Sequence, residues 1–168
     1  MRKAMEFDRS DDGQMKLVRV TLVAAFMLGS MQPSHAAVRI VFDQGGRIGN
    51  YIDRFKVLRD FGASVIIDGI CAGACTLVLA YIPHDSICVT PRAVFGFRVA
   101  DNPGPDGKAI PNPEATQMLY DRYPPAVRQW ITRHGGMTAR AIYLRGRQLQ
   151  ALYRPCTTDV EGGRGQPR

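Results

Sequence analysis

The stretch SVIIDGICAGACTLVLAYI, residues 64–82, restricts the fold more than any other part of the chain. It begins with a β-branched apolar run, passes through small residues, and continues as an apolar segment. This order predicts a buried strand over Ser64–Asp68, a glycine turn over 69–74, and a helix over Cys75–Ile82. A helix that is apolar on all sides needs neighbours to cover it. We therefore expect a globular domain with this segment at its centre.

The same pattern occurs one unit earlier. VRIVF at 38–42 predicts a buried strand, and the glycine pair Gly45-Gly46 follows it. An apolar stripe over 47–61 predicts a helix that ends at Gly62. Two successive strand–turn–helix units indicate parallel strands, whose carboxyl ends lie at one edge of the sheet. The two glycine turns should therefore meet at that edge.

Further elements follow along the chain. We expect a loop over 101–113, because proline, glycine and asparagine are frequent there, and a helix start at Asn112-Pro113-Glu114. The other predicted elements are strands at 87–90 and 93–99, helices at 124–134 and 138–153, and a disordered tail at 157–168.

Residues 1–36 have the pattern of an export signal. Lys16 and Arg19 precede the apolar run TLVAAFMLGSM, and Ala36 closes a small-residue cleavage site. The run is shorter than the roughly 20 residues that a membrane span needs, which favours cleavage over an uncleaved anchor. Met15 is an alternative start of the chain.

Cleavage would leave a periplasmic or secreted domain over 37–156 without a membrane span. The chain carries a formal net charge of +7 at pH 7, with arginines concentrated in its last third. We interpret this excess as a solvated helical face, because no basic motif interleaved with aromatic residues is present. A nucleic-acid partner is not expected.

All four cysteines fall in this domain. Cys71, Cys75, Cys88 and Cys156 allow three pairings, and at least one disulfide is expected in an oxidising compartment. The alternative is a metal site at CAGAC. Its spacing differs from that of a zinc knuckle, and no histidine lies nearby at ligand spacing, so we expect no metal.

Two glycine turns at one sheet edge can form an oxyanion-binding site. Their backbone N–H groups can converge on a carbonyl oxygen and stabilise negative charge that develops on it. Glycine allows the close approach, and the start of a helix adds N–H groups without partners. The alternative is that these glycines only close tight turns.

The segments DQGGRIGNYIDRF, VIIDGICAGACTLVLA and ICVTPRAVFGF, within residues 38–100, resemble the Clp protease/crotonase-like superfamily, in particular its small exported bacterial members. The resemblance implies an α/β fold with a Clp protease/crotonase-like core of βαβ units and C-terminal helices. It places oxyanion N–H groups at Gly45, Gly46 and Ala74. The nucleophilic serine of the family matches Gly73, and its general-base histidine matches Arg98.

Both catalytic positions depart from the family. Gly73 has no side chain that can attack, and Arg98 cannot accept a proton near neutral pH. The expected protein is a pseudoenzyme that binds a peptide or a partner protein, without a cofactor. Family members often form rings or stacks, so an oligomer is compatible with the resemblance.

Three alternatives stay open at this stage. An active peptidase would need a non-standard nucleophile, for which Cys71 and Cys75 are the nearest candidates. The crotonase branch would need a carboxylate such as Glu114 or Asp121 and an acyl thioester, which is not expected outside the cytoplasm. A decayed gene product without selected activity is the third.

Other residues have simpler interpretations. Arg98 either holds a carboxylate or chain terminus, or forms a salt bridge to Asp43 or Asp101. The remaining candidates are expected to be capping or surface groups (His84, His134, Lys56, Lys108) or core or interface aromatics (Tyr120, Trp130).

Overall fold

The computed structural model describes residues 37–157 of the chain. These residues belong to the second of two compact units, which begins at His35. The predicted export signal at 1–36 and all but the first residue of the predicted tail at 157–168 lie outside the described residues. Over 37–157, none of the helices has the length and apolar character needed to cross a membrane.

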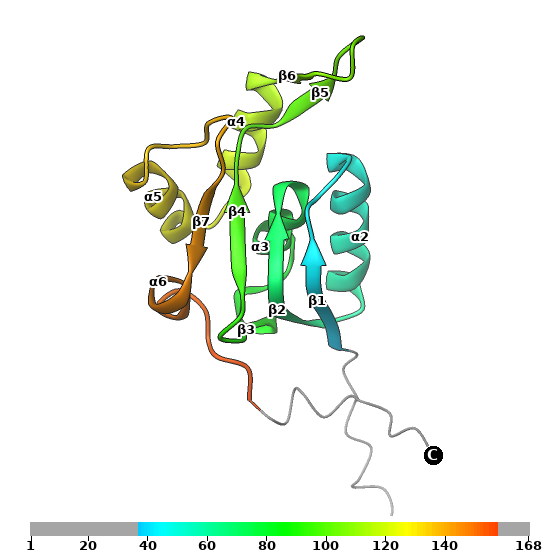
Figure 1. The fold of residues 1–168 in the computed structure, drawn as a ribbon. Helices are drawn as coiled ribbons and strands as arrows, with labels where there is room; N and C mark the ends of the chain where they lie inside the picture. The colour runs from blue at the N-terminus through cyan, green and yellow to red at the C-terminus, as the bar shows by residue number, and fades with distance from the viewer. Residues whose placement is uncertain (1–36, 158–168) are drawn as a thin grey trace, which may run out of the picture. The chain divides into compact units, whose positions relative to one another are not determined.

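The described unit has a mixed α/β fold (Figure 1). In chain order its elements are β1 (Ala37–Asp43), α2 (Ile48–Asp60), β2 (Ser64–Ala72), the 3₁₀ helix η1 (Gly73–Leu77), α3 (Val78–Tyr81), the 3₁₀ helix η2 (His84–Ser86), β3 (Ile87–Val89), β4 (Val94–Phe97), β5 (Asp101–Pro103), β6 (Ala109–Pro111), α4 (Pro113–Arg122), α5 (Pro125–Arg133), β7 (Ile142–Arg145) and α6 (Gly146–Gln150).

The main sheet places the predicted turns at one edge. Within the described residues it has five strands. Four of them follow the order β1-β2-β4-β7, and the fifth, β3, pairs with β2 outside this path. The strands β1, β2, β3 and β4 are mutually parallel where they pair, and β7 runs antiparallel to β4. In Figure 1 the four strands of the path lie side by side, and β1 is an edge strand next to α2.

One face of the sheet carries the core. Val65, Ile67 and Cys71 alternate along β2 and pack with Phe95 and Phe97 of β4. The buried partners from the helices are Phe55 of α2, Leu77 of η1, Val78 of α3, Leu119 of α4, and Val127, Trp130 and Ile131 of α5. The predicted enclosure of 75–82 is confirmed, because Cys75 to Leu79 are all buried, although this segment is a 3₁₀ helix followed by a short α-helix.

The first strand differs from its prediction. The run at 38–42 is predicted to be buried, but Phe42 is 66% exposed, and β1 is an edge strand that pairs with β2 only. The predicted turn at Gly69 is also wrong, since β2 continues to Ala72. Its register with β1 shifts between Ile40 and Phe42, and a Cβ on Gly69 would lie 1.9 Å from the carbonyl oxygen of Val41. Glycine is required there because the bulged strand approaches too closely for a side chain.

Three predicted helices are confirmed with small changes at their ends. α2 ends where Gly62 adopts a positive φ of 64°, although Phe61, which was expected on its apolar stripe, is 81% exposed. α4 begins at the predicted position, where the Asn112 side chain accepts a hydrogen bond of 2.9 Å from the N–H of Ala115. α5 occupies Pro125–Arg133 within the predicted 124–134.

Two predictions in the C-terminal half are wrong. The helix expected at 138–153 is replaced by β7 and the short α6. In β7, Leu144 is buried while its neighbours Tyr143 and Arg145 are exposed, which is the two-residue period of a strand. The loop expected at 101–113 contains the hairpin of β5 and β6, which projects beyond the main sheet (Figure 1).

The buried carboxylate of Asp68 joins three segments. It lies on β2, is 5% exposed, and accepts hydrogen bonds from Arg39 of β1 (2.7 Å), Thr90 (2.7 Å) and Arg92 (2.6 and 3.1 Å). The hydrogen bonds from Arg92, together with those from Thr90 and Arg39, lower the pKa of Asp68 far below its usual range, against the effect of burial. This carboxylate is therefore charged at neutral pH and ties the edge strand β1 to the segment after β3.

The described residues contain two disulfides. Cys71 pairs with Cys75, and Cys88 pairs with Cys156. The expectation of at least one disulfide is confirmed, and no cysteine remains free. Two disulfides are consistent with a protein that folds in a periplasmic or extracellular compartment.

Candidate functional site

The two glycine turns meet at the carboxyl ends of β1 and β2, as the sequence predicts. Gly45 and Gly73 have positive φ values of 86° and 56°. A Cβ on Gly45 would lie 2.5 Å from the backbone nitrogen of Ala74, and one on Gly73 would lie 3.0 Å from the carbonyl oxygen of Gln44. The backbones of the two turns are therefore in direct contact, and a side chain at Gly45 would separate them.

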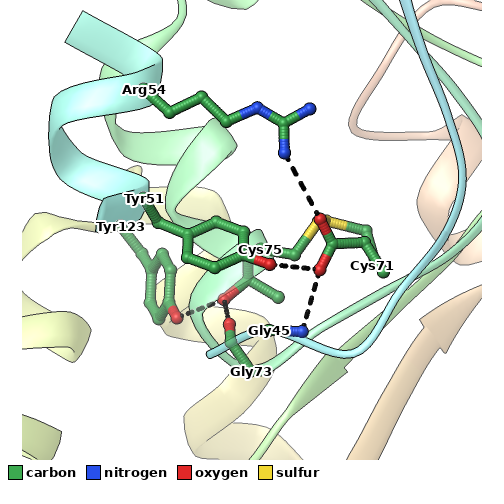
Figure 2. Close-up of a disulfide and its surroundings, with 9 residues drawn as sticks. Gly45, Tyr51, Arg54, Cys71, Gly73, Cys75 and Tyr123 are labelled. Carbon is green, nitrogen blue, oxygen red and sulfur yellow. Dashed lines mark hydrogen bonds and ion pairs between the residues drawn. A yellow bond between two sulfur atoms is a disulfide. The ribbon is translucent and has the colours of Figure 1, made fainter. Parts of the chain in front are cut away.

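The carboxylate of Asp43 organises the first turn, and Figure 2 labels the three residues that contact it, Gly45, Tyr51 and Arg54. Its Oδ1 accepts hydrogen bonds from the N–H of Gly45 (2.9 Å) and from the hydroxyl of Tyr51 (2.5 Å), and its Oδ2 lies 3.7 Å from Nη1 of Arg54. Burial, together with this hydrogen bond, raises the pKa of Tyr51 to about 12. The N–H of Gly45 is thus engaged within the turn. Among the described residues, no acceptor reaches the N–H of Gly46 or that of Ala74.

The disulfide Cys71–Cys75 brackets the second turn. Cys71 lies near the end of β2 and Cys75 lies in η1, so the bridge spans Gly73 with a sequence separation of four (Figure 2). Both sulfur-bearing side chains are fully buried. Neither cysteine presents a thiolate, so the nucleophile that an active peptidase would need is not supplied by this pair.

A buried hydroxyl fixes the orientation of the Gly73–Ala74 peptide. Thr76 Oγ1 donates a hydrogen bond of 2.6 Å to the carbonyl oxygen of Gly73 and lies 2.6 Å from the hydroxyl of Tyr123 on the segment after α4. The peptide bond is trans, so its C=O and N–H point in opposite directions. Holding the Gly73 carbonyl against Thr76 therefore turns the N–H of Ala74 away from Thr76.

We expect Thr76 and Tyr123 to be energetically coupled. Thr76→Val removes a hydrogen bond to the part-buried Gly73 carbonyl and leaves the buried Tyr123 hydroxyl without its partner, which should lower the free energy of unfolding by about 1–2 kcal/mol. Adding Tyr123→Phe removes that unsatisfied hydroxyl, so the double variant should lose about 1 kcal/mol less than the sum of the single variants. Urea unfolding of the four proteins measures this coupling. Strictly additive losses would contradict it.

A cavity of about 420 Å³ opens beside the joined turns. Its wall includes Gly46 and Arg47 at the first turn and Gly73 and Ala74 at the second. The lining also includes residues 98–100 after β4, residues 101–103 of β5, and Gly107 and Ala109 of the same hairpin. The structure thus brings Arg98, which the family resemblance aligns with the general base, to the same cavity as both turns.

Arg98 forms one of the two salt bridges considered from the sequence. Its Nη1 contacts Oδ2 of Asp101, while Asp43 is engaged by Gly45 and Tyr51 instead. The pair remains accessible, because the side chain of Arg98 is 45% exposed and that of Asp101 is 22% exposed. A guanidinium has five N–H donors, so this one contact leaves Arg98 able to bind another anion.

The other candidates lie outside the cavity. His84 contacts the carbonyl oxygen of Leu152, and His134 caps α5 by a 2.7 Å contact with the carbonyl oxygen of Trp130. Trp130 is buried, and Tyr120 is partly buried. The exposed remainder consists of Lys56, Lys108, Glu114 and Asp121. No group of three or more metal-binding side chains is found over residues 37–157.

Two features of the site were missed by sequence analysis. The pairing of Asp43 with Tyr51 had a local signal, because residues eight apart in a strand–turn–helix unit can approach each other. The hydrogen bond between Thr76 and Tyr123 had no such signal, since 47 residues separate them.

No family model matches the chain, and no curated protein matches it.

Proposed function

We propose that this chain is an exported Clp protease/crotonase-like pseudoenzyme that binds a peptide, or a peptide segment of a partner protein, at the joined glycine turns. One observation carries the proposal. The turns that would stabilise an oxyanion are kept in contact beside a cavity, while the position that would attack is Gly73. A site with binding groups and without a nucleophile supports recognition rather than turnover.

The geometry around Gly73 supports this assignment. Its two flanking cysteines are bonded to each other, and the same cavity is lined by Arg98, a guanidinium at the position that matches the family's general-base histidine. A residual acceleration of roughly a thousandfold to ten-thousandfold over water is the most that binding and N–H donors alone give in serine peptidases. The two disulfides agree with export.

The test of the pseudoenzyme is hydrolysis. We expect the purified protein to leave fluorescent casein and mixed peptide substrates intact, and the Gly73→Ser/Arg98→His double variant to cleave them slowly. The matched control is Gly73→Ala/Arg98→His, which places the same Cβ 3.0 Å from Gln44 O but adds no hydroxyl. Turnover by the unmutated protein above a no-enzyme blank would overturn the proposal.

Binding is measured in parallel. A dye-labelled pool of short peptides should give a saturable rise in fluorescence anisotropy with the unmutated protein. The matched site variant is Gly46→Pro, which removes one of the two N–H groups that lack an acceptor. We expect it to weaken binding by about tenfold. An absence of saturable binding to the unmutated protein would contradict peptide recognition.

A further inference from the structure

The charged side chains that line the cavity carry more positive than negative charge. Within the described residues its wall holds two guanidinium groups, those of Arg47 and Arg98, and one carboxylate, that of Asp101. Asp101 is already paired with Arg98. The cavity therefore has an excess of about one positive charge, which suits a ligand with one negative charge.

The hydrogen-bonding groups point to the same class of ligand. The N–H groups of Gly46 and Ala74 have no acceptor among the described residues, and Arg98 uses Nη1 for its contact with Asp101. These groups are all donors. A carboxylate is acceptor-only, offers two oxygens with about four acceptor sites, and is the planar partner that guanidinium binds best.

The rest of the wall indicates what is attached to that carboxylate. Ile48, Val99, Ala100 and Leu119 also line the cavity, and its volume exceeds that of an isolated anion. Pockets that bind organic ligands combine apolar lining with a few polar groups that fix orientation. An inorganic phosphate has no apolar body to fill this space, whereas the last residue of a polypeptide carries an apolar side chain beside its carboxylate.

We infer that the cavity binds the free C-terminal carboxylate of a peptide or protein. This inference rests on the proposed function and specifies which part of the ligand is recognised. The carboxylate accepts hydrogen bonds from the N–H groups of Gly46 and Ala74, and it shares the guanidinium of Arg98 with Asp101. The terminal side chain lies against the apolar wall.

The test compares two dye-labelled pentapeptide pools of equal composition, one with free C-terminal carboxylates and one with carboxamides. The free-acid pool should bind the full chain at least tenfold more tightly in anisotropy titrations. Arg98→Gln should weaken binding of the free-acid pool about tenfold and leave the carboxamide pool unchanged. Asp101→Asn removes the competing carboxylate and should strengthen binding of the free-acid pool severalfold.

Arg140→Gln is the matched control, because Arg140 is exposed and lies outside the cavity, so the same charge is lost elsewhere. Equal affinity for the two pools would overturn the carboxylate assignment and leave peptide binding intact. Failure of both pools to bind would overturn the proposed function as well. Displacement of the free-acid pool by inorganic phosphate but not by acetate would also overturn the assignment.

Discussion

Replacing Cys88 and Cys156 with alanine is expected to lower the free energy of unfolding by about 4 kcal/mol. This bridge has a sequence separation of 68, and it fastens the segment after α6 to β3, which pairs with β2. Breaking it releases a long loop in the unfolded chain, and loop length sets the entropic part of the stabilisation.

The bridge around Gly73 provides the comparison. Cys71 and Cys75 are separated by only four residues, so the double alanine variant should lose only about 2 kcal/mol by the same reasoning. Each variant replaces two bonded cysteines, of which Cys71, Cys75 and Cys88 are buried and Cys156 is partly buried, so the two variants can be compared directly. Urea unfolding under non-reducing conditions measures both losses. Equal losses would show that chain entropy is not what distinguishes the two bridges.

The second large effect is expected at Asp68. Asp68→Asn should lower the free energy of unfolding at pH 7 by about 2–3 kcal/mol, because it leaves Arg39 and Arg92 around a neutral amide that cannot replace the carboxylate. We expect a value below that of a fully buried pair, since the side chain of Arg92 is 73% exposed and regains water.

This effect should depend on pH in one direction. The pKa of Asp68 is lowered in the folded protein, so its stabilisation is fully present above the ordinary carboxyl pKa of about 4 and is lost as the pH falls below it. The difference between the unmutated protein and Asp68→Asn should therefore shrink between pH 7 and about pH 3 in urea unfolding. A difference that stays constant over this range would contradict the linkage.

Asp60→Asn is the control for Asp68. Asp60 also pairs with an arginine, Arg59, but its side chain is 63% exposed. Exposed ion pairs contribute little, so this variant should change the free energy of unfolding by less than about 0.5 kcal/mol at either pH. Comparing Asp68→Asn with Asp60→Asn separates the effect of losing a buried carboxylate from the effect of losing an exposed one.

The sequence predicts the first half of the fold better than the second. Two strand–turn–helix units leave a strong periodic signal, and the contact between Gly45 and Gly73 follows from their shared topology. Residues 138–153 carry no such signal. The four residues of β7 are too few to show a clear alternation, and it is the pairing with β4 that makes them a strand. Local pattern alone favoured a helix there.

The site was predictable in its backbone and not in its side chains. Gly46, Gly73 and Arg98 line one cavity. Arg98 pairs with Asp101, three residues further along the chain, whereas Asp43 is engaged by Gly45, Tyr51 and Arg54. The disulfide connectivity could not be chosen from the spacing of four cysteines, because it depends on which strands become neighbours.

The β5–β6 hairpin forms a two-stranded sheet of its own, joined to the main sheet through residues 98–100 and held by the hydrogen bond of 2.8 Å from Asn112 N to Ala100 O. Its tip, residues 104–107, is a turn closed by a hydrogen bond between Gly107 N and Gly104 O. Insertions and exchanges are tolerated at such tips, since few buried contacts depend on them. The part of the cavity wall that the hairpin supplies can therefore change in sequence while the sheet and its disulfides stay unchanged.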